Sequence, residues 1–532
     1  MTMPPTKLTR GQEGMWLVVQ ESAGGPLPAW ILQDLTVEFD PASAVMTGAE
    51  ALAAVVRRHE GLRTTVGADP AGSPVQIVHD DVRPDVETVV TDAAGFREAK
   101  RALLDRLSRD PFDLGGELPF RAGLVDCGTR QALVIVFQHI AMDRWGLRLV
   151  YEELLEALTR GRVDRPRPMQ PREVAAREDS PEGRRRNEMA LTYLEQCLQS
   201  APQSLFTESE NDGEPHFTST YLHSPAGHRA ARQIADRCQV TEPAVWLSVL
   251  AVYYALSSGV DGCRFLMQAV NRVEKSELTV VGKMARTVPV FFDLSGNPGF
   301  FRIAQRVLRT TVRAMRSANF SNGQYDEIVR RVQDRRGIHF RDQVFVNYLQ
   351  ELAPELAADD EPDGISGRAV TRESTHGPSV EFTVLSGRDV VTLDVDRRYF
   401  KDPEGVLHWL DSLLVQLADA GDIPLGELPM PPEIQPTAGL VRCDNCWVSL
   451  PEIAAALESH PAVRSARVSV SENEGAERLV AHVHPAHGDV PVEELRAHLT
   501  QRLPDSSTLM VPHHFVLTHP GTPLTPTPAN HP

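Results

Sequence analysis

Short apolar runs alternate with amphipathic stretches along most of the chain, a pattern that predicts strands alternating with helices. Residues 131–138 (QALVIVFQ) are apolar and rich in β-branched side chains, which is typical of a buried strand. Apolar residues recur at helical spacing over 145–159, whereas 244–257 are almost wholly apolar and predict a helix buried on several sides. The same criteria predict further helices at 49–58 and 407–417, and further strands at 344–348 and 390–395.

Three stretches interrupt this pattern. Residues 165–186 hold four prolines among many charges and read as a linker, and residues 421–436 hold five prolines. The tail from Pro520 is rich in proline and threonine and is expected to fray. We therefore expect two lobes of mixed α/β (α+β) structure followed by a small C-terminal unit, with bounds at 1–175, 176–432 and 433–532.

Composition and charge narrow the class of protein. The 532 residues include 54 Lys and Arg against 72 Asp and Glu, a net charge of −18, which argues against a general binder of nucleic acid or anionic membranes. Six cysteines make no disulfide framework. The first ten residues lack the apolar region of a signal peptide, and no apolar run approaches the length of a membrane span. The sequence thus favours a soluble, cytoplasmic protein.

A histidine and an aspartate follow the apolar run at 131–138. His139 leads from the expected strand into a loop, a position that can hold an imidazole rigidly at a cleft, where it could take a proton near pH 7. Asp143, four residues later, could brace the loop by pairing with an arginine. The spacing alone is a weak signal, and a hydrogen-bonded structural histidine remains the alternative.

Six segments resemble, in order, the motifs of condensation domains of nonribosomal peptide synthetases. RHEGLRTTV at 58–66 matches the family pattern RHExLRTxF almost completely, and QHIAMDR at 138–144 takes the place of the active-site motif HHxxxDG. The other four are LTRGQEGMW at 8–16, VNR at 270–272, VGKMARTVPV at 281–290 and FVNYLQ at 345–350. The resemblance covers about residues 6–430. Six motifs in the right order are hard to obtain by chance.

The resemblance implies a V-shaped pseudo-dimer of two lobes, each like chloramphenicol acetyltransferase, with the active site at their junction. A partner carrier protein would present an acyl or aminoacyl thioester on its phosphopantetheine arm, and an amine would attack that thioester. Carried over by position, His139 would orient or deprotonate the nucleophile and stabilise the intermediate. Asp143 would form an ion pair with Arg272, near Arg63, and Asn347 would face the same cavity from the second lobe.

Three positions depart from the family pattern. Gln138 replaces the first histidine of the active-site motif, a mainly structural residue in the family, and can still form hydrogen bonds. Arg144 replaces the glycine beside the tunnel, where it would either narrow the donor channel or supply a cation to a ligand carboxylate or phosphate. Arg286 replaces the usual asparagine of the motif VGxFxNTLPL, so two added arginines hint at an anionic or unusual substrate. Trp145 and Gly146 are expected to line the same channel.

Residues 440–532 resemble the small C-terminal subdomain of adenylating enzymes. Residues 442–444 match its hinge motif, but the hairpin that follows is expected to be largely missing, and Ala529 takes the position of the catalytic lysine. No glycine-rich phosphate loop is found, so this unit is expected to be inactive and kept for packing or partner docking. Cys443 and Cys446 form a CxxC pair without a second pair, so no metal site is expected.

These observations predict a stand-alone condensation enzyme that forms an amide bond between a carrier-bound acyl or aminoacyl thioester and an amine in natural-product biosynthesis. Its carrier protein would act in trans, the acceptor would be free or carrier-bound, and no bound cofactor is implied. The chain is expected to be monomeric. Two alternatives stay open: a non-catalytic recruitment domain, which Gln138 and Arg144 favour, and an O-acyltransferase that forms an ester on a small acceptor.

Overall fold

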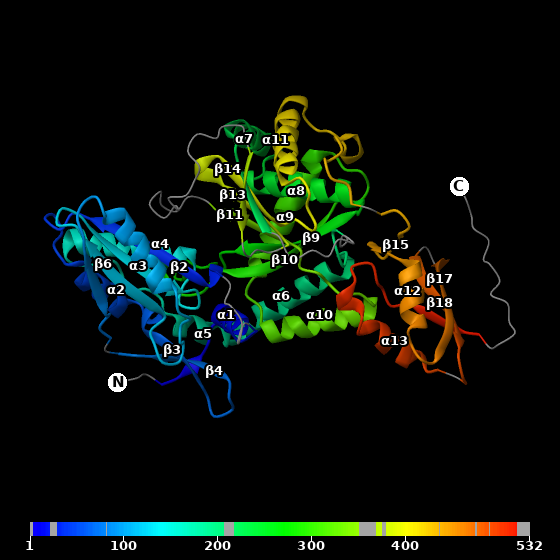
Figure 1. The fold of residues 1–532 in the computed structure, drawn as a ribbon, viewed down its shortest axis with the longest axis horizontal. Coiled ribbons are helices and arrows are strands. Elements are labelled where there is room, and N and C mark those ends of the chain that lie inside the picture. Colours follow the sequence, from blue (N-terminus) through cyan, green and yellow to red (C-terminus); the bar gives the residue numbers. More distant parts are fainter. Residues whose placement is uncertain are drawn as a thin grey trace.

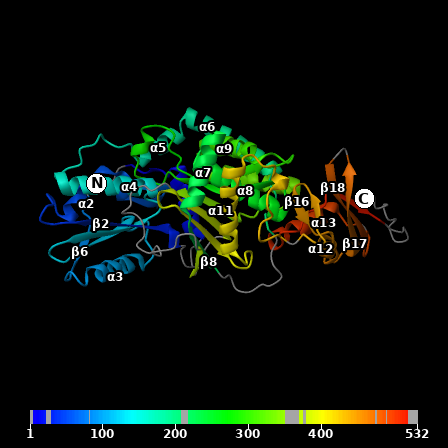
Figure 2. The ribbon, with the colours of Figure 1, turned by 90° about the horizontal axis from the view of Figure 1, so that it is seen from above.

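Three units lie side by side in the computed structural model, which describes residues 4–21, 29–80, 82–206, 217–349, 369–374, 379–435, 437–473, 476–488 and 490–518. An N-terminal lobe is followed by a larger central lobe and a small C-terminal unit along the longest axis (Figure 1). The view from above shows the same order (Figure 2). Mixed α/β lobes are the fold class that the sequence predicts. The expected fraying of the tail from Pro520 lies outside the described residues.

A four-stranded sheet forms the centre of the N-terminal lobe. Its order is β2 (Leu32–Phe39), β7 (Gln131–Gln138), β6 (Phe120–Asp126) and β5 (Val86–Val90). Helices α2 (Gly48–Arg58) and α4 (Arg144–Arg160) cover one face of this sheet, and α3 (Phe96–Ser108) covers the other. Because β7 is central and covered on both faces, its apolar residues are buried, which confirms the strand expected at 131–138.

The central lobe holds a seven-stranded sheet. Its order is β10 (Arg286–Asp293), β9 (Gly262–Ala269), β11 (Val344–Leu349), β13 (Val380–Leu385), β14 (Val390–Asp396), β8 (Phe217–His223) and β12 (Ala369–Ser374). Strand β11 runs parallel to both of its neighbours, and the other pairings are antiparallel. The apolar core of the lobe joins this sheet to α7 (Pro225–Cys238), α8 (Glu242–Ser258), α9 (Phe300–Arg316) and α11 (Pro403–Ala420).

Helix α8 is buried nearly throughout, as its apolar composition predicts. The expected helices at 49–58, 145–159 and 407–417 are present as α2, α4 and α11, and the expected strands at 344–348 and 390–395 as β11 and β14. Among the described residues, no single helix meets the length and hydropathy of a membrane span; α7 and α8 do so only as a pair that bends by 103°.

The prediction of a linker at 165–186 is wrong for most of these residues. Helix α5 (Pro171–Glu178) and helix α6 (Pro181–Ser200) occupy it. Each proline stands in the first turn of its helix, where no backbone N–H is needed and the fixed φ favours the start. Ser180 accepts a hydrogen bond from the Gly183 N–H (3.1 Å) and caps α6. Two of the four prolines that indicated a linker, Pro171 and Pro181, are therefore helix starts.

A short hairpin begins the C-terminal unit, joining β15 (Val441–Cys443) to β16 (Cys446–Val448). Asp444 and Asn445 at its tip have φ values of 50° and 58°, as a two-residue turn with both centres left-handed requires. This hairpin contains the residues that match the hinge motif, and helix α12 (Leu450–Glu458) follows it directly. A three-stranded sheet, β17 (Val463–Asn473), β18 (Ala476–Pro485) and β19 (His514–Leu517), follows with helices α12 (Leu450–Glu458) and α13 (Val492–Thr500).

Arg336, at the end of α10 (Asn322–Arg336), fastens this hairpin to the central lobe. Its guanidinium donates to the carboxylate and carbonyl of Asp444 (2.6 and 2.9 Å). It also donates to the carbonyls of Leu198, in the last turn of α6, and of Ala201, just after it (2.7 and 2.6 Å). The residue is 7% exposed, so these four bonds are shielded from water. One apolar core continues from the central lobe into the C-terminal unit. The two units therefore pack against each other.

Replacing Arg336 by alanine should loosen the C-terminal unit. The change leaves two buried carbonyls and the Asp444 carboxylate without their donor, which should cost about 3 kcal/mol. Urea unfolding, together with limited proteolysis of the C-terminal unit, measures this effect. Arg335→Ala removes an exposed neighbour and should change the unfolding free energy by less than about 0.5 kcal/mol. Equal unfolding midpoints for the two variants would contradict the docking role.

Candidate active site

His139 stands at the end of β7 with its imidazole held in one orientation. Its backbone N–H donates to the carbonyl of Ile31 (2.8 Å). Its ring Nδ1 lies 2.8 Å from the carbonyl of Met142, which can only accept, so Nδ1 carries the proton and Nε2 is an acceptor. Trp30 meets the ring edge to face, with centroids 6.4 Å apart. The half-buried ring therefore presents an unprotonated Nε2.

Asp143 locks the loop that carries His139. Its carboxylate caps α4 by accepting from the N–H of Gly146 (2.9 Å). It also accepts from the N–H groups of Met284 and Ala285 (3.0 and 2.7 Å), which lie just before β10. The residue is 1% exposed. Burial alone would raise its pKa, but Arg272 and these hydrogen bonds outweigh burial and lower the pKa to about 2. The ionised carboxylate thus joins the two lobes.

Arg272 completes this junction from the segment between β9 and β10. It binds Asp143 through two hydrogen bonds of 2.7 and 2.9 Å, and its side chain is fully buried. A third contact reaches the carbonyl of Val280 (3.2 Å). The ion pair expected between Asp143 and Arg272 is present, whereas Arg63 donates instead to the carbonyl of His79 (2.6 Å).

Lys283 is a site residue that the sequence reasoning missed. Its Nζ lies 3.0 Å from Nε2 of His139, and the residue is 7% exposed. Burial and the Lys283 charge lower the pKa of His139 to about 4, although the Met142 carbonyl and Asp143 act in the opposite direction. Burial lowers the pKa of Lys283 itself to about 8, against the effect of Asp143. A signal existed: Lys283 is one of five lysines in the chain and lies inside VGKMARTVPV.

Gln138 replaces a histidine, and its side-chain oxygen has a hydrogen-bond partner. Its side-chain Oε1 accepts from the backbone N–H of Ile140 (2.6 Å). The backbone N–H of Gln138 donates to the carbonyl of Pro119 (2.9 Å). The residue is 2% exposed. Gln138 therefore shapes the turn that presents His139, as expected for a structural position.

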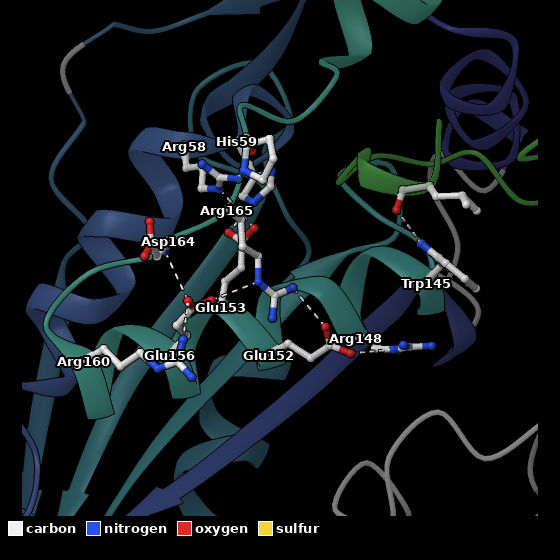
Figure 3. Close-up of polar contacts among 12 residues, drawn as sticks. Arg58, His59, Trp145, Arg148, Glu152, Glu153, Glu156, Arg160, Asp164 and Arg165 are labelled. Carbon is white, nitrogen blue, oxygen red and sulfur yellow. Dashed lines mark hydrogen bonds and ion pairs between the residues drawn. The ribbon is translucent and has the colours of Figure 1, made fainter. Parts of the chain in front are cut away.

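Arg144, Trp145 and Gly146 form the first turn of α4 beside the junction. The Nε of Arg144 is buried without a hydrogen-bond partner among the described residues. Burial lowers the pKa of Arg144, and the charges of Asp34 and Arg388 act on it in opposite directions. Trp145 donates through Nε1 to the carbonyl of Leu278 (2.9 Å; Figure 3). These contacts place the turn against the segment that crosses from the central lobe.

Gly146 packs closely against the opposite lobe. A Cβ at this position would lie 3.0 Å from the Cβ of Met142 and 3.6 Å from the backbone nitrogen of Gly282. Its close neighbours are protein atoms from both lobes, so the tight packing explains the glycine. Its expected role in lining a substrate channel remains a prediction.

The guanidinium of Arg286 contacts other residues of the protein. Its guanidinium donates to the carbonyl of Arg10 (2.6 Å) and to Oδ1 of Asn322 (2.7 Å), and it covers the ring of Phe320. Arg286 therefore braces α1 (Arg10–Glu21) against α10. Two of its N–H groups thus have partners inside the fold, and its expected place in a substrate channel stays a prediction.

Asn347 lies on β11, opposite Thr383 of β13. Its neighbours Val344 and Val346 point into the core of the central lobe, so strand alternation puts the half-buried Asn347 on the other face of the sheet. No described hydrogen bond joins it to His139. Its expected place in the same cavity stays a prediction.

The RHEGLR motif anchors helix α4. His59 and Arg58 both bind Glu153 of α4, at 2.7 and 3.0 Å. Figure 3 shows a second cluster along the same helix, in which Arg165 joins Glu152 and Glu156 (3.0 and 2.9 Å). The segment that follows α4 therefore packs against this helix. Together these contacts hold α4 in place, and its first turn lies beside His139.

The geometry combines a proton acceptor at Nε2, a buried ammonium beside it and a rigid interlobe clamp. The model of the condensation domain matches residues 5–382. The chain belongs to the condensation-domain family. Domains of this family are found in nonribosomal peptide synthetases, which serve natural-product biosynthesis.

Relatives of this condensation domain are parts of much longer proteins. A probable non-canonical nonribosomal peptide synthetase, CymA of Salinispora arenicola, is 24% identical over 497 residues, which are 85% of this chain and 6% of CymA. The solved domain that mediates chain release from the enacyloxin polyketide synthase has a TM-score of 0.62 at 18% identity, covering 82% of this chain and 86% of that one. The X-domain bound to OxyB from teicoplanin biosynthesis has a TM-score of 0.58 at 18% identity over 81% and 97%. Both structures show a shared fold.

Proposed function

We propose that this condensation domain forms an amide bond between an acyl or aminoacyl thioester, held by a carrier protein, and an amine. The observation that carries the proposal is the presentation of His139: Nδ1 is committed to the Met142 carbonyl, so Nε2 is an acceptor for the proton of an attacking amine. The interlobe ion pair of Asp143 and Arg272 supports it, because that pair fixes the loop on which His139 stands.

The reaction needs few groups. The amine nitrogen attacks the carbonyl carbon of the thioester, a C–N bond forms and the carbonyl oxygen gains negative charge. His139 Nε2 takes the proton of the amine. The C–S bond then breaks, the carbonyl re-forms and the proton passes to the sulfur of the phosphopantetheine arm, which belongs to the carrier substrate. Positioning and electrostatic stabilisation would supply most of the rate enhancement.

A mass-spectrometric condensation assay tests this function. Carrier proteins loaded with acyl or aminoacyl thioesters are mixed with a panel of amines and with the matching alcohols, with and without the protein. Amide product that exceeds the protein-free rate would support the proposal, and ester product from the alcohols alone would assign an O-acyltransferase instead. Intact thioesters in every mixture would refute acyl transfer to these acceptors.

A second candidate is a non-catalytic recruitment domain. Lys283 favours it, because its ammonium occupies the Nε2 that catalysis requires. The shared fold with a teicoplanin X-domain, whose structure contains OxyB, agrees with such a use of this fold. Pull-down of loaded carrier protein by a chain that leaves all thioesters intact would select this candidate over amide formation.

The C-terminal unit is proposed to be an inactive relative of the adenylation C-terminal subdomain. Its short β15–β16 hairpin and its attachment through Arg336 support a packing role. Deleting the unit at the Arg336 contact would expose apolar core that it shares with the central lobe, so the unit is expected to matter for stability before activity.

A further inference from the structure

Lys283 places a buried ammonium beside the imidazole of His139. Its Nζ approaches Nε2 of His139 at 3.0 Å, and the other ammonium hydrogens have no acceptor among the described residues. A buried ammonium with unused donors is costly, and it favours a negatively charged group at that place. Lys283 lies just before β10, whose ends are charged and whose centre is apolar.

The backbone around Lys283 is held rigidly. A side chain at Gly11 of α1 would collide with the Lys283 carbonyl, so α1 touches this segment directly. On the other side, Asp143 binds the N–H groups of Met284 and Ala285. These contacts hold the backbone of Lys283 in place, with its ammonium beside His139. Electrostatic stabilisation of a transition state requires a charge that is positioned in advance in this way.

The surrounding charges do not neutralise this ammonium. Asp143 is the acidic group that acts on it, and that carboxylate already binds Arg272 and three backbone N–H groups. Arg272 and Arg286 face the same region and repel the ammonium. The site consequently keeps a net positive character beside Nε2.

We propose that Lys283 is a catalytic residue that stabilises the negative charge on the thioester oxygen while His139 takes the proton of the amine. This inference rests on the proposed amide-forming function. Before substrate binds, Lys283 donates to Nε2 and keeps that nitrogen unprotonated. When the amine donates to Nε2 in its place, the ammonium turns to the adjacent carbonyl oxygen. Lys283 neither gains nor loses a proton; its hydrogen bond moves from nitrogen to oxygen and back.

The dependence of activity on pH should report the protonation of both His139 and Lys283. His139 must be neutral, so activity should rise with pH through about 4, where its pKa lies. Lys283 must be protonated, so activity should fall with pH through about 8. A bell-shaped profile of kcat/KM with these two limbs is expected for the wild type.

Kinetics of Lys283→Met, Lys283→Arg and Lys275→Met test the role. Lys283→Met should lower kcat by about 10²–10³-fold, as loss of an oxyanion donor does, and should abolish the alkaline limb. Lys283→Arg keeps a cation and should retain part of the rate with activity extended above pH 8. Lys275→Met, an exposed lysine of the same crossing segment, should behave as the wild type. Wild-type or higher kcat in Lys283→Met would overturn the proposal.

A second readout separates this inference from the proposed function. The pKa of His139 can be followed by ¹⁵N NMR of labelled histidine, with His139→Ala identifying the signal. Loss of Lys283 should raise that pKa from about 4 toward the ordinary value, whatever the activity. An unmoved His139 titration would overturn the pairing. A shifted titration in a chain whose wild type forms no product would refute the proposed function and the oxyanion role, while leaving the Lys283–His139 pair established.

Discussion

Replacement of His139 by alanine should lower kcat/KM for amide formation by about 10²–10⁴-fold, the range in which a positioned general base contributes. The variant loses the Nε2 that would accept the amine proton, and Lys283 loses its hydrogen-bond acceptor. Initial rates of product formation by mass spectrometry measure the effect across pH 5–8. Because the ring is half-buried and its one backbone contact is local, the fold should persist.

The control for this variant is His408→Ala, which removes an exposed imidazole from α11. It should keep the wild-type rate. Circular dichroism and urea unfolding of both variants separate a catalytic loss from a folding loss. A rate within threefold of wild type in folded His139→Ala would show that the histidine is not the base, and it would favour the recruitment candidate.

Removal of the Arg272 guanidinium should lower the free energy of unfolding by about 3–5 kcal/mol, the usual cost of leaving one member of a buried ion pair alone. In Arg272→Ala, the Asp143 carboxylate would stay buried with only backbone N–H partners. The loop of His139 and the crossing segment of Lys283 would both lose their anchor. Activity should therefore fall with stability, and urea unfolding with parallel rate measurements tests both.

The conservative variant Asp143→Asn isolates the charge in this clamp. It keeps the shape of the side chain but removes the ion pair with Arg272, and it should be destabilised at neutral pH. The sign of the pH dependence follows from the pKa of Asp143, which is about 2 in the fold against an ordinary value of 3.8. Stabilisation by the wild-type carboxylate is complete above the ordinary value and is lost as pH falls through about 2. Equal acid sensitivity in wild type and Asp143→Asn would contradict this account.

Much of the local structure follows from residue patterns. The apolar run at 131–138 is β7, and the amphipathic stretch after it is α4, because a buried strand and a one-sided helix leave distinct periods. The order of the motifs leads to the condensation-domain family and to the pairing of Asp143 with Arg272. Local rules failed at 165–186, where Pro171 and Pro181 start helices, since a proline does not tell a linker from a first turn.

The site itself could be predicted only in part. His139 and Asp143 are four positions apart and belong to one motif, so the sequence predicts their position near a strand end. Lys283 lies 144 residues from His139 and comes from the other lobe. Arg286, two positions after a buried backbone contact of Asp143, donates to Arg10 and Asn322, which are distant in sequence. The direction of a side chain at the lobe junction depends on how the surfaces of both lobes pack. Residues far along the chain form those surfaces, so the local sequence does not predict it.

The sequence by itself determined the main helices and strands, the family and the histidine at the end of β7, because each depends on contacts or patterns within a short stretch of chain. Only the tertiary structure decided that Lys283 faces Nε2, that Arg286 is a brace and that Arg336 fastens the C-terminal hairpin. These three cations are buried, and a buried cation is oriented by the acceptors that packing brings to it from distant segments.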